Sequence, residues 1–258
     1  MPTRLVFVAF LSALLLVACR PTPSDPIQYL HREDSIIIQL LTVDGDAPEI
    51  ERRLAVPEFT LYGNGTLIYQ NVNADGTRLL ETTLPEDAVQ ELLEGIVNEG
   101  FLNFLYDQPA PEGASRVTTF VYAQTRDLAN AVSIRGADDP LPVDAGDDFD
   151  QYRTVQDFVE ALQALDLTAL GGSEPTTYVA EQYLMIIRFL DGAIEPSERI
   201  LRGSAAVAVL TDFRRAPDST LERLFGPVAS NLEHQPGEET YFAPLLPFYE
   251  NFPEFNLQ

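Results

Sequence analysis

Short runs of alternating or β-branched apolar residues mark several strands in the central part of the chain. Segment 35–43 (SIIIQLLTV) is one of them, and segments 79–83, 117–122 and 131–134 carry the same signal between turn-forming residues. Such alternation is typical of strands that bury one face in an antiparallel sheet. The sequence therefore predicts an antiparallel β-meander.

The strongest hairpin signal lies at Asn64 and Gly65. These residues stand between the alternating runs 59–62 and 67–69. Both residue types tolerate positive φ, which the tightest hairpin turns require. We therefore expect a hairpin here, and its tip is a candidate binding loop.

Two amphipathic helices are predicted to pack on this sheet, which gives an α+β fold class. The first begins near Pro85, with acidic residues in its first turn, and ends before Gly100. The second follows an acidic loop. The apolar residues that recur at helical spacing are Val89, Leu92, Leu93, Ile96 and Val97 in the first helix, and Val155, Phe158, Val159, Leu162 and Leu165 in the second. The similarity of 155–162 to 89–96 fits either two repeated ribbon-plus-helix units or two helices that merely share a period.

A Gly-Gly-Ser sequence at 171–173 is a plausible domain boundary. Residues 27–170 are predicted to form the α+β domain. Residues 174–258 are predicted to form a mixed carboxy-terminal region, either separate from that domain or continuous with it. Within this region the patterns favour a buried strand or helix at 183–190, an apolar run at 205–210, a helix at 220–232 and an extended tail from residue 241.

The amino terminus has the pattern of a secretory signal. Arg4 supplies a positive charge, and residues 5–18 form an apolar run broken only by Ser12. A transmembrane helix needs roughly 20 apolar residues, so this run is too short to span a bilayer. Residues 1–18 are therefore interpreted as a signal peptide.

The signal ends in Leu16-Val17-Ala18-Cys19, which resembles the lipobox of bacterial lipoproteins at all four positions. The resemblance implies cleavage after Ala18 and attachment of a diacylglyceryl group to Cys19. Residues 19–26 would then form a lipidated, proline-rich tether that holds the protein on a membrane. The expected location is the cell envelope, on the outer face of the cytoplasmic membrane or, in a bacterium with two membranes, on the outer membrane. The alternative is an ordinary secretory signal with an incidental cysteine.

The composition narrows the classes of partner. Forty acidic residues face 16 basic ones, all of them arginine, and the net charge is −24. Such a surface repels nucleic acid, so no nucleic-acid partner is expected. The charge fits either solubility or a dedicated cation-binding role. Cys19 is the single cysteine of the chain, so its lipidation would leave no thiol for a disulfide, a metal site or a nucleophile.

Familiar catalytic motifs are missing from the sequence. The two histidines, His31 and His234, lie in polar settings without the HExxH spacing of zinc enzymes, and the chain has no GxSxG elbow, P-loop or dinucleotide fingerprint. These observations favour a protein that is not an enzyme and has no cofactor. Because carboxylates are abundant, a hydrolase that uses a pair of acidic residues stays open as an alternative.

Two stretches have the composition of calcium-binding loops. Residues 71–76 (NVNADG) begin like an EF-hand loop, but Thr82 occupies the position where such loops carry a bidentate glutamate, which favours a hairpin turn. The acidic loop before the second helix could gather oxygen ligands around Ca²⁺ or could simply be solvated. Its candidate ligands are Asp144, Asp147, Asp148 and Asp150.

From about residue 57 to 166, the order of strands, Asn-Gly turn and helices resembles emfourin, a proteinaceous inhibitor of thermolysin-like metalloproteases. The same pattern is similar to uncharacterised domains of bacterial lipoproteins. The resemblance implies that a rigid segment would enter an enzyme cleft, and the candidates are the tip at Asn64 and Gly65 and the loop 107–114. No inhibitory residue can be carried over. The chain also departs from the family by its lipobox, its strand at 35–43 and its carboxy-terminal region.

The sequence as a whole favours a membrane-anchored, extracytoplasmic lipoprotein that binds a protein or a small ligand without catalysis. Inhibition of secreted metalloproteases and hydrolysis by acidic residues are the alternatives.

Overall fold

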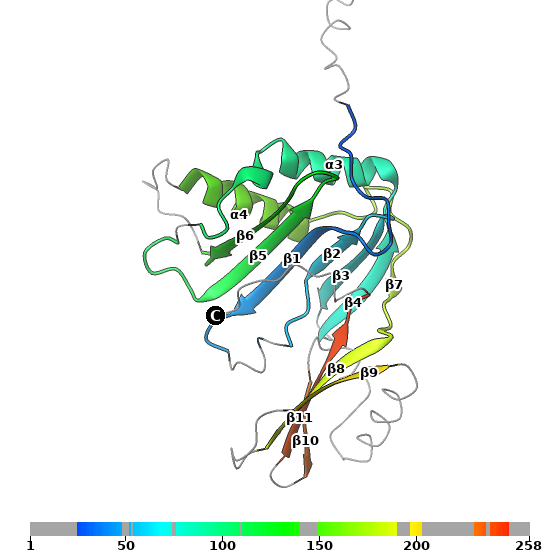
Figure 1. The fold of residues 1–258 in the computed structure, drawn as a ribbon, viewed down its shortest axis with the longest axis vertical. Helices are drawn as coiled ribbons and strands as arrows, with labels where there is room; N and C mark the ends of the chain where they lie inside the picture. Colours follow the sequence, from blue (N-terminus) through cyan, green and yellow to red (C-terminus); the bar gives the residue numbers. More distant parts are fainter. Residues whose placement is uncertain are drawn as a thin grey trace, which may run out of the picture.

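Among the residues that it describes, a computed structural model gives two antiparallel sheets, two α-helices and a short 3₁₀-helix, η1 (Phe101–Asn103) (Figure 1). This arrangement confirms the predicted α+β class. No helix in the described part of the chain combines the length and apolarity needed to cross a membrane. The structure describes residues 25–47, 52, 54–73, 76–108, 110–139, 149–189, 197–202, 230–235 and 238–247.

The larger sheet has seven strands in the order β6-β5-β1-β2-β3-β4-β7, and every neighbouring pair is antiparallel. The meander predicted from the sequence forms its centre. The strands are β1 (Ile36–Asp44), β2 (Phe59–Tyr62), β3 (Thr66–Asn73), β4 (Gly76–Thr83), β5 (Val117–Gln124), β6 (Ala129–Arg135) and β7 (Thr176–Thr177).

The β2–β3 hairpin turns at Asn64 and Gly65, as the sequence predicts. Gly65 adopts a φ of 84°, and its amide donates a hydrogen bond to the Tyr62 carbonyl oxygen at 2.9 Å. The Asn64 side-chain oxygen accepts a hydrogen bond from the Thr66 amide at 3.0 Å. A positive φ is readily adopted by glycine, so the local sequence determines this turn.

Helices α3 (Glu86–Val97) and α4 (Asp150–Gln163) bury apolar residues against one face of this sheet. The buried set, here called the helix-side core, includes Leu93 of α3, Val159 of α4 and Leu61 of β2. Helical spacing places these residues on one stripe of each helix, while alternation places the sheet residues on one face. A bulge between Ile36 and Ile38 brings both Ile37 and Ile38 into this core.

A second apolar cluster covers the opposite face of the sheet. Its sheet residues include Ile36, Tyr62 and Ile68, and it also contains Leu246, which follows the last strand of the second sheet. The Tyr62 hydroxyl donates a hydrogen bond to the Pro247 carbonyl oxygen at 2.8 Å. Leu246 and Pro247 therefore pack against the first sheet.

The smaller sheet has four strands in the order β10-β11-β8-β9. Its strands are β8 (Gln182–Phe189), β9 (Ser197–Arg202), β10 (Ser230–Gln235) and β11 (Glu238–Leu245). The helix predicted at 220–232 is wrong at 230–232, which lie in β10. Pairing with β11 supplies backbone partners to this segment and overrides its helical pattern. Residues 220–229 and the apolar run at 205–210 lie outside the described residues.

The position of the domain boundary stays a prediction. Just after the Gly-Gly-Ser sequence, β7 joins the edge of the first sheet by pairing with β4. The Ser173 carbonyl oxygen also accepts a hydrogen bond from the Thr82 hydroxyl at 2.6 Å. The chain therefore keeps contact with the first sheet until shortly before β8.

Candidate functional site

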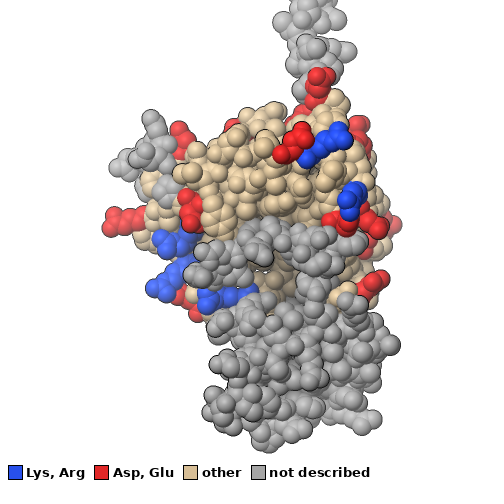
Figure 2. Space-filling view, in the orientation of Figure 1, with Lys and Arg blue, Asp and Glu red and all other residues tan. Residues whose placement is uncertain are grey.

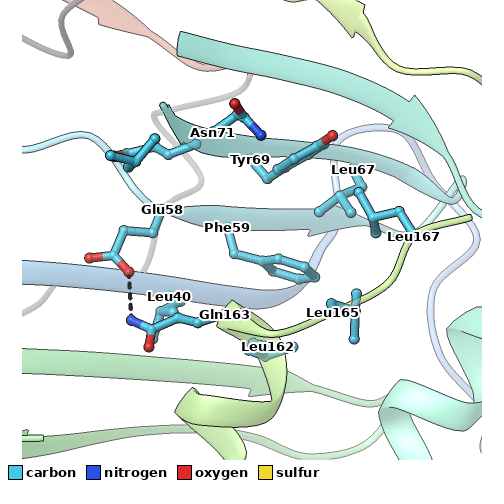
Figure 3. Close-up of a pocket in the computed structure, with 12 residues that line it drawn as sticks. Leu40, Glu58, Phe59, Leu67, Tyr69, Asn71, Leu162, Gln163, Leu165 and Leu167 are labelled. Atoms are coloured by element: carbon cyan, nitrogen blue, oxygen red, sulfur yellow. Dashed lines mark hydrogen bonds between the residues drawn. The ribbon is translucent and has the colours of Figure 1, made fainter. Parts of the chain in front are cut away.

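A pocket of about 540 Å³ opens between the helix-side face of the sheet and the end of α4 (Figure 3). Strands β1, β2 and β3 form one side of it, and α4 with the segment that follows forms the other. Ligand pockets in proteins usually have volumes of roughly 300–1,000 Å³. The size of this pocket therefore suits a small organic molecule.

The pocket has both apolar and polar walls. Figure 3 shows the Phe59 ring between the leucines that come from α4 and those that come from the sheet. Several wall residues also belong to the helix-side core or pack against it, so their positions are fixed by packing. The apolar walls are Leu40, Phe59, Leu67, Leu162, Leu165 and Leu167.

The end of α4 determines where this wall stands. The sequence pattern placed Leu165 on the face of the helix, but α4 ends at Gln163, and Leu165 lies beyond it. The Asp166 side chain accepts hydrogen bonds from the amides of Thr168 and Ala169 at 3.0 and 3.1 Å, which turns the chain. Leu165 and Leu167 consequently face the sheet instead of extending the helix.

Polar groups occupy one end of the pocket. The Gln163 side-chain amide donates a hydrogen bond to the Glu58 carboxylate at 3.3 Å and so connects α4 to the start of β2. Asn71 of β3 lies toward the same end in Figure 3, whereas the Tyr69 hydroxyl points toward Leu67 at the other end. Burial raises the pKa of Tyr69 above its ordinary value, so its hydroxyl stays protonated over the physiological range.

This set of side chains can bind a ligand. Among the described residues of the lining, Glu58 is the carboxylate, and no histidine, serine or cysteine stands beside it. A hydrolase of the acidic type needs two carboxylates across the substrate. The pocket supplies apolar contact area, a phenol and one carboxylate, which can hold and orient a ligand.

A second, smaller pocket of about 340 Å³ has different chemistry. It lies by β5 and β6, and its lining includes Arg52, Arg135 and Asp107. The Ser133 hydroxyl donates a hydrogen bond to the Asp107 carboxylate at 2.6 Å, and the Ser133 amide donates one to the Tyr106 carbonyl oxygen at 2.6 Å. These bonds fix the start of the loop 107–114 against the edge strand.

The candidate binding tip is enclosed on two sides. Asn64 is exposed, but Gly63 and Gly65 are buried. A Cβ atom built on Gly63 would lie 1.8 Å from the Leu30 carbonyl oxygen, and one on Gly65 would lie 2.6 Å from the Leu84 carbonyl oxygen. The tip is therefore packed between the amino-terminal segment and the start of α3. Its binding role stays a prediction.

Most of the calcium candidates, Asp144, Asp147 and Asp148, lie outside the described residues. Asp150 is described, and its carboxylate pairs with Arg153 at 2.8 Å in the first turn of α4. Among the residues that the structure places, no three His, Cys, Asp or Glu side chains gather as metal ligands would. In Figure 2 the described acidic side chains are spread along the margins of the visible face.

The residues of the expected lipidation site, Ala18 and Cys19, also lie outside the described residues.

The sequence did not reveal that the amino-terminal segment is fastened to α3. The Gln90 side chain accepts a hydrogen bond from the Ile27 amide at 2.9 Å and donates one to the Ile27 carbonyl oxygen at 3.0 Å. The Tyr29 hydroxyl donates to the Glu86 carboxylate at 2.5 Å, and His31 lies 3.7 Å from the same carboxylate. The chain is thus held beside α3 as soon as the proposed tether ends.

The Glu86 contacts predict a pH-dependent contribution to stability. Desolvation raises the pKa of the Glu86 carboxyl. The hydrogen bonds from Tyr29 and Gln90, together with the nearby His31, lower the pKa by more than desolvation raises it, so the net shift is downward. A depressed pKa stabilises the folded state above the unfolded value, and this contribution is lost as the pH falls through the folded pKa. Because the Glu86 side chain is 52% exposed, we expect at most about 1 kcal/mol.

Urea unfolding of the wild type and of Glu86→Gln checks this prediction at neutral pH and at about pH 3. The wild type should be more stable than the variant at neutral pH, and the difference should shrink in acid. Glu91→Gln, an exposed carboxylate on the same helix, is the matched control. A difference between the wild type and Glu86→Gln that is the same at both pH values contradicts the assignment.

Comparison of the chain with protein-family models, with curated proteins and with solved structures finds no match in any of the three. Its function therefore has to be inferred from its own residues and their geometry.

Proposed function

We propose that the protein is a lipid-anchored, extracytoplasmic binding protein that holds a small, mainly apolar molecule in the pocket at the end of α4. The pocket is the observation that carries the binding half of the proposal. It has a suitable volume, an apolar wall of leucines and Phe59, and polar groups that can orient a ligand. The anchor is supported by the lipobox resemblance at residues 16–19.

Helix α4 contributes to this function by forming part of the pocket wall. It buries an apolar stripe in the helix-side core, and the end of the helix lines the pocket together with Phe59 and Leu67 of the sheet. The core packing fixes both walls of the pocket, so a ligand meets a site that is already formed. A site formed in advance saves the entropy of ordering loops on binding.

The geometry favours this function over protease inhibition. An inhibitor presents a protruding, rigid segment to an enzyme cleft, whereas the backbone on both sides of Asn64 is packed against Leu30 and Leu84. A small-molecule ligand needs only the concave surface that the structure contains. A hydrolase would need a second carboxylate, and the described residues of the lining supply one, Glu58.

Photolabelling tests the binding proposal. The full-length protein, in phosphatidylcholine nanodiscs, is irradiated with a diazirine analogue of decanol, and the labelled peptides are identified by mass spectrometry. We expect label in segments 58–72 and 162–167. In Leu165→Asp, a charge replaces part of the apolar wall, so labelling should fall by about tenfold, equivalent to roughly 1.4 kcal/mol of binding free energy.

Leu128→Asp is the matched control, because Leu128 is 55% exposed and lies outside the pocket lining. This variant should label like the wild type. Label that is absent from both segments, or that is unaffected by Leu165→Asp, would show that the pocket does not bind the probe.

A further inference from the structure

We infer that the ligand carries a cationic head group on its apolar body; this inference rests on the proposed function and names the chemical class that the same pocket selects. Glu58 is the only charged side chain among the described residues that line the pocket. Its carboxylate accepts a hydrogen bond from Gln163, and none of the ion pairs found among the described residues involves it. A carboxylate has about four lone-pair positions, so Glu58 can accept from Gln163 and from a ligand together.

Two aromatic rings also line the pocket. Phe59 and Tyr69 are directly opposite each other in the β2–β3 register, so both side chains lie on the helix-side face of the sheet. In Figure 3 both rings extend from their strands toward the leucine end of the pocket. Cations bind favourably over the faces of Phe and Tyr rings within about 6 Å of the centroid. The pocket therefore offers an ammonium group a carboxylate at one end and aromatic faces along its wall, and an anion would gain from neither.

The pocket also gives the ligand a direction. In Figure 3, Glu58 lies at one end of the pocket, while Leu165 and Leu167 lie at the other. A charged group buried among the leucines would lose its hydration without gaining a partner. The apolar chain is therefore placed along Leu67, Leu165 and Leu167, and the head group is placed at Glu58.

The surrounding charge acts in the same sense. The net charge of −24 attracts cations and repels anions during diffusional encounter. The cation to consider on this side of the sheet is Arg78, which stands opposite Asn71 in the β3–β4 register but is outside the lining. A cationic head group therefore meets its counter-charge, Glu58, inside the pocket, whereas Arg78 does not line it.

Three photoreactive probes with the same decyl chain test the inference: decylamine, decanol and decanoate analogues carrying a diazirine at the same carbon. The full-length protein in phosphatidylcholine nanodiscs is titrated with each at neutral pH, and label in segments 58–72 and 162–167 is measured. We expect half-maximal labelling by the amine at a concentration about tenfold below that of the carboxylate, with the alcohol between them.

The variants separate head-group selection from binding itself. In Glu58→Gln, the amine and the carboxylate should label within about twofold of each other, while labelling by decanol stays unchanged. Because each comparison uses the same lipid, partitioning of the probes into the bilayer cancels between the wild type and the variant. Glu58→Asp should restore part of the preference for the amine, and Glu91→Gln, which removes an exposed carboxylate outside the pocket, should leave it intact.

The outcomes distinguish the two proposals. Labelling of both segments by all three probes with equal efficiency, a preference for decanoate, or a preference for the amine that survives Glu58→Gln overturns the cationic ligand while leaving an apolar binding site. Failure of every probe to label the segments overturns the binding function itself.

Discussion

Alanine in place of Gly63 is expected to lower the free energy of unfolding by about 3 kcal/mol. A Cβ atom at this position would lie 1.8 Å from the Leu30 carbonyl oxygen and 3.0 Å from the Arg32 amide nitrogen. These neighbours are backbone atoms, so no flexible side chain can move aside. Gly63 also donates a hydrogen bond from its amide to the Ser35 carbonyl oxygen at 2.8 Å, which holds the hairpin close to the amino-terminal segment.

Relief of this clash would require the amino-terminal segment to lift away from the hairpin. That movement would strain the contacts that Gln90 and Glu86 make with Ile27 and Tyr29. The loss should therefore appear both in urea unfolding and as faster hydrogen exchange in residues 27–35, because exchange reports local opening.

Gly95→Ala is the matched control for this substitution. Gly95 is exposed in the interior of α3, and a Cβ atom there would meet nothing within 4 Å. Alanine favours helix over glycine, so this variant should gain about 0.5–1 kcal/mol. A Gly63→Ala variant as stable as the wild type would show that the amino-terminal segment is not held against the hairpin as described.

The parts of the fold that were predicted correctly depend on residues close together in the chain. The turn at Asn64 and Gly65 needs only a few adjacent residues, and its sequence determines the geometry. The stripe of α3 repeats within a few turns, and Gly100, which takes a φ of 78° just after the helix, supplies a conformation that glycine adopts readily. These local conformational preferences are kept in the folded protein because the tertiary contacts favour the same conformations.

The features that were missed depend on distant partners. Segment 230–232 has a helical pattern, but strand β11 pairs with it and makes it a strand. Strand β7 was not predicted, since two residues carry no periodicity and gain their structure from β4. The burial of Leu246 and the bond from Tyr62 to Pro247 join positions that are 185 residues apart, which no local pattern can contain.

The candidate pocket was missed for the same reason. Its walls come from β1, β2 and β3 and from the segment after α4, and its existence depends on α4 ending at Gln163. In the sequence, Leu165 continues the apolar stripe of the helix, so the pattern does not show that the helix ends at Gln163. Glu58 carries no local signal that distinguishes it from the other acidic residues of the chain.

The docked amino-terminal segment connects the proposed anchor with the proposed pocket. Between Cys19 and Ile27 the chain can extend roughly 28 Å at most, because a residue spans about 3.5 Å when fully extended. Ile27 is already bonded to Gln90 of α3. If Cys19 is lipidated, α3 is therefore kept near the membrane surface, where apolar and amphipathic molecules are concentrated.

Replacement of Cys19 by alanine is expected to abolish incorporation of radiolabelled fatty acid into the protein. Cys19 is the single cysteine of the chain, so no other thiol can form the thioether with the diacylglyceryl group. Membrane fractionation alone would not decide the matter, because a signal peptide that stays uncleaved could also hold the variant on the membrane. Incorporation of label is the direct measurement, and Ser24→Ala, which changes the tether but keeps the thiol, should incorporate as much label as the wild type. Label in the Cys19→Ala variant, or none in the wild type, would contradict the proposal that a lipid on Cys19 anchors the protein. The reason to place the pocket beside a membrane would then be lost as well.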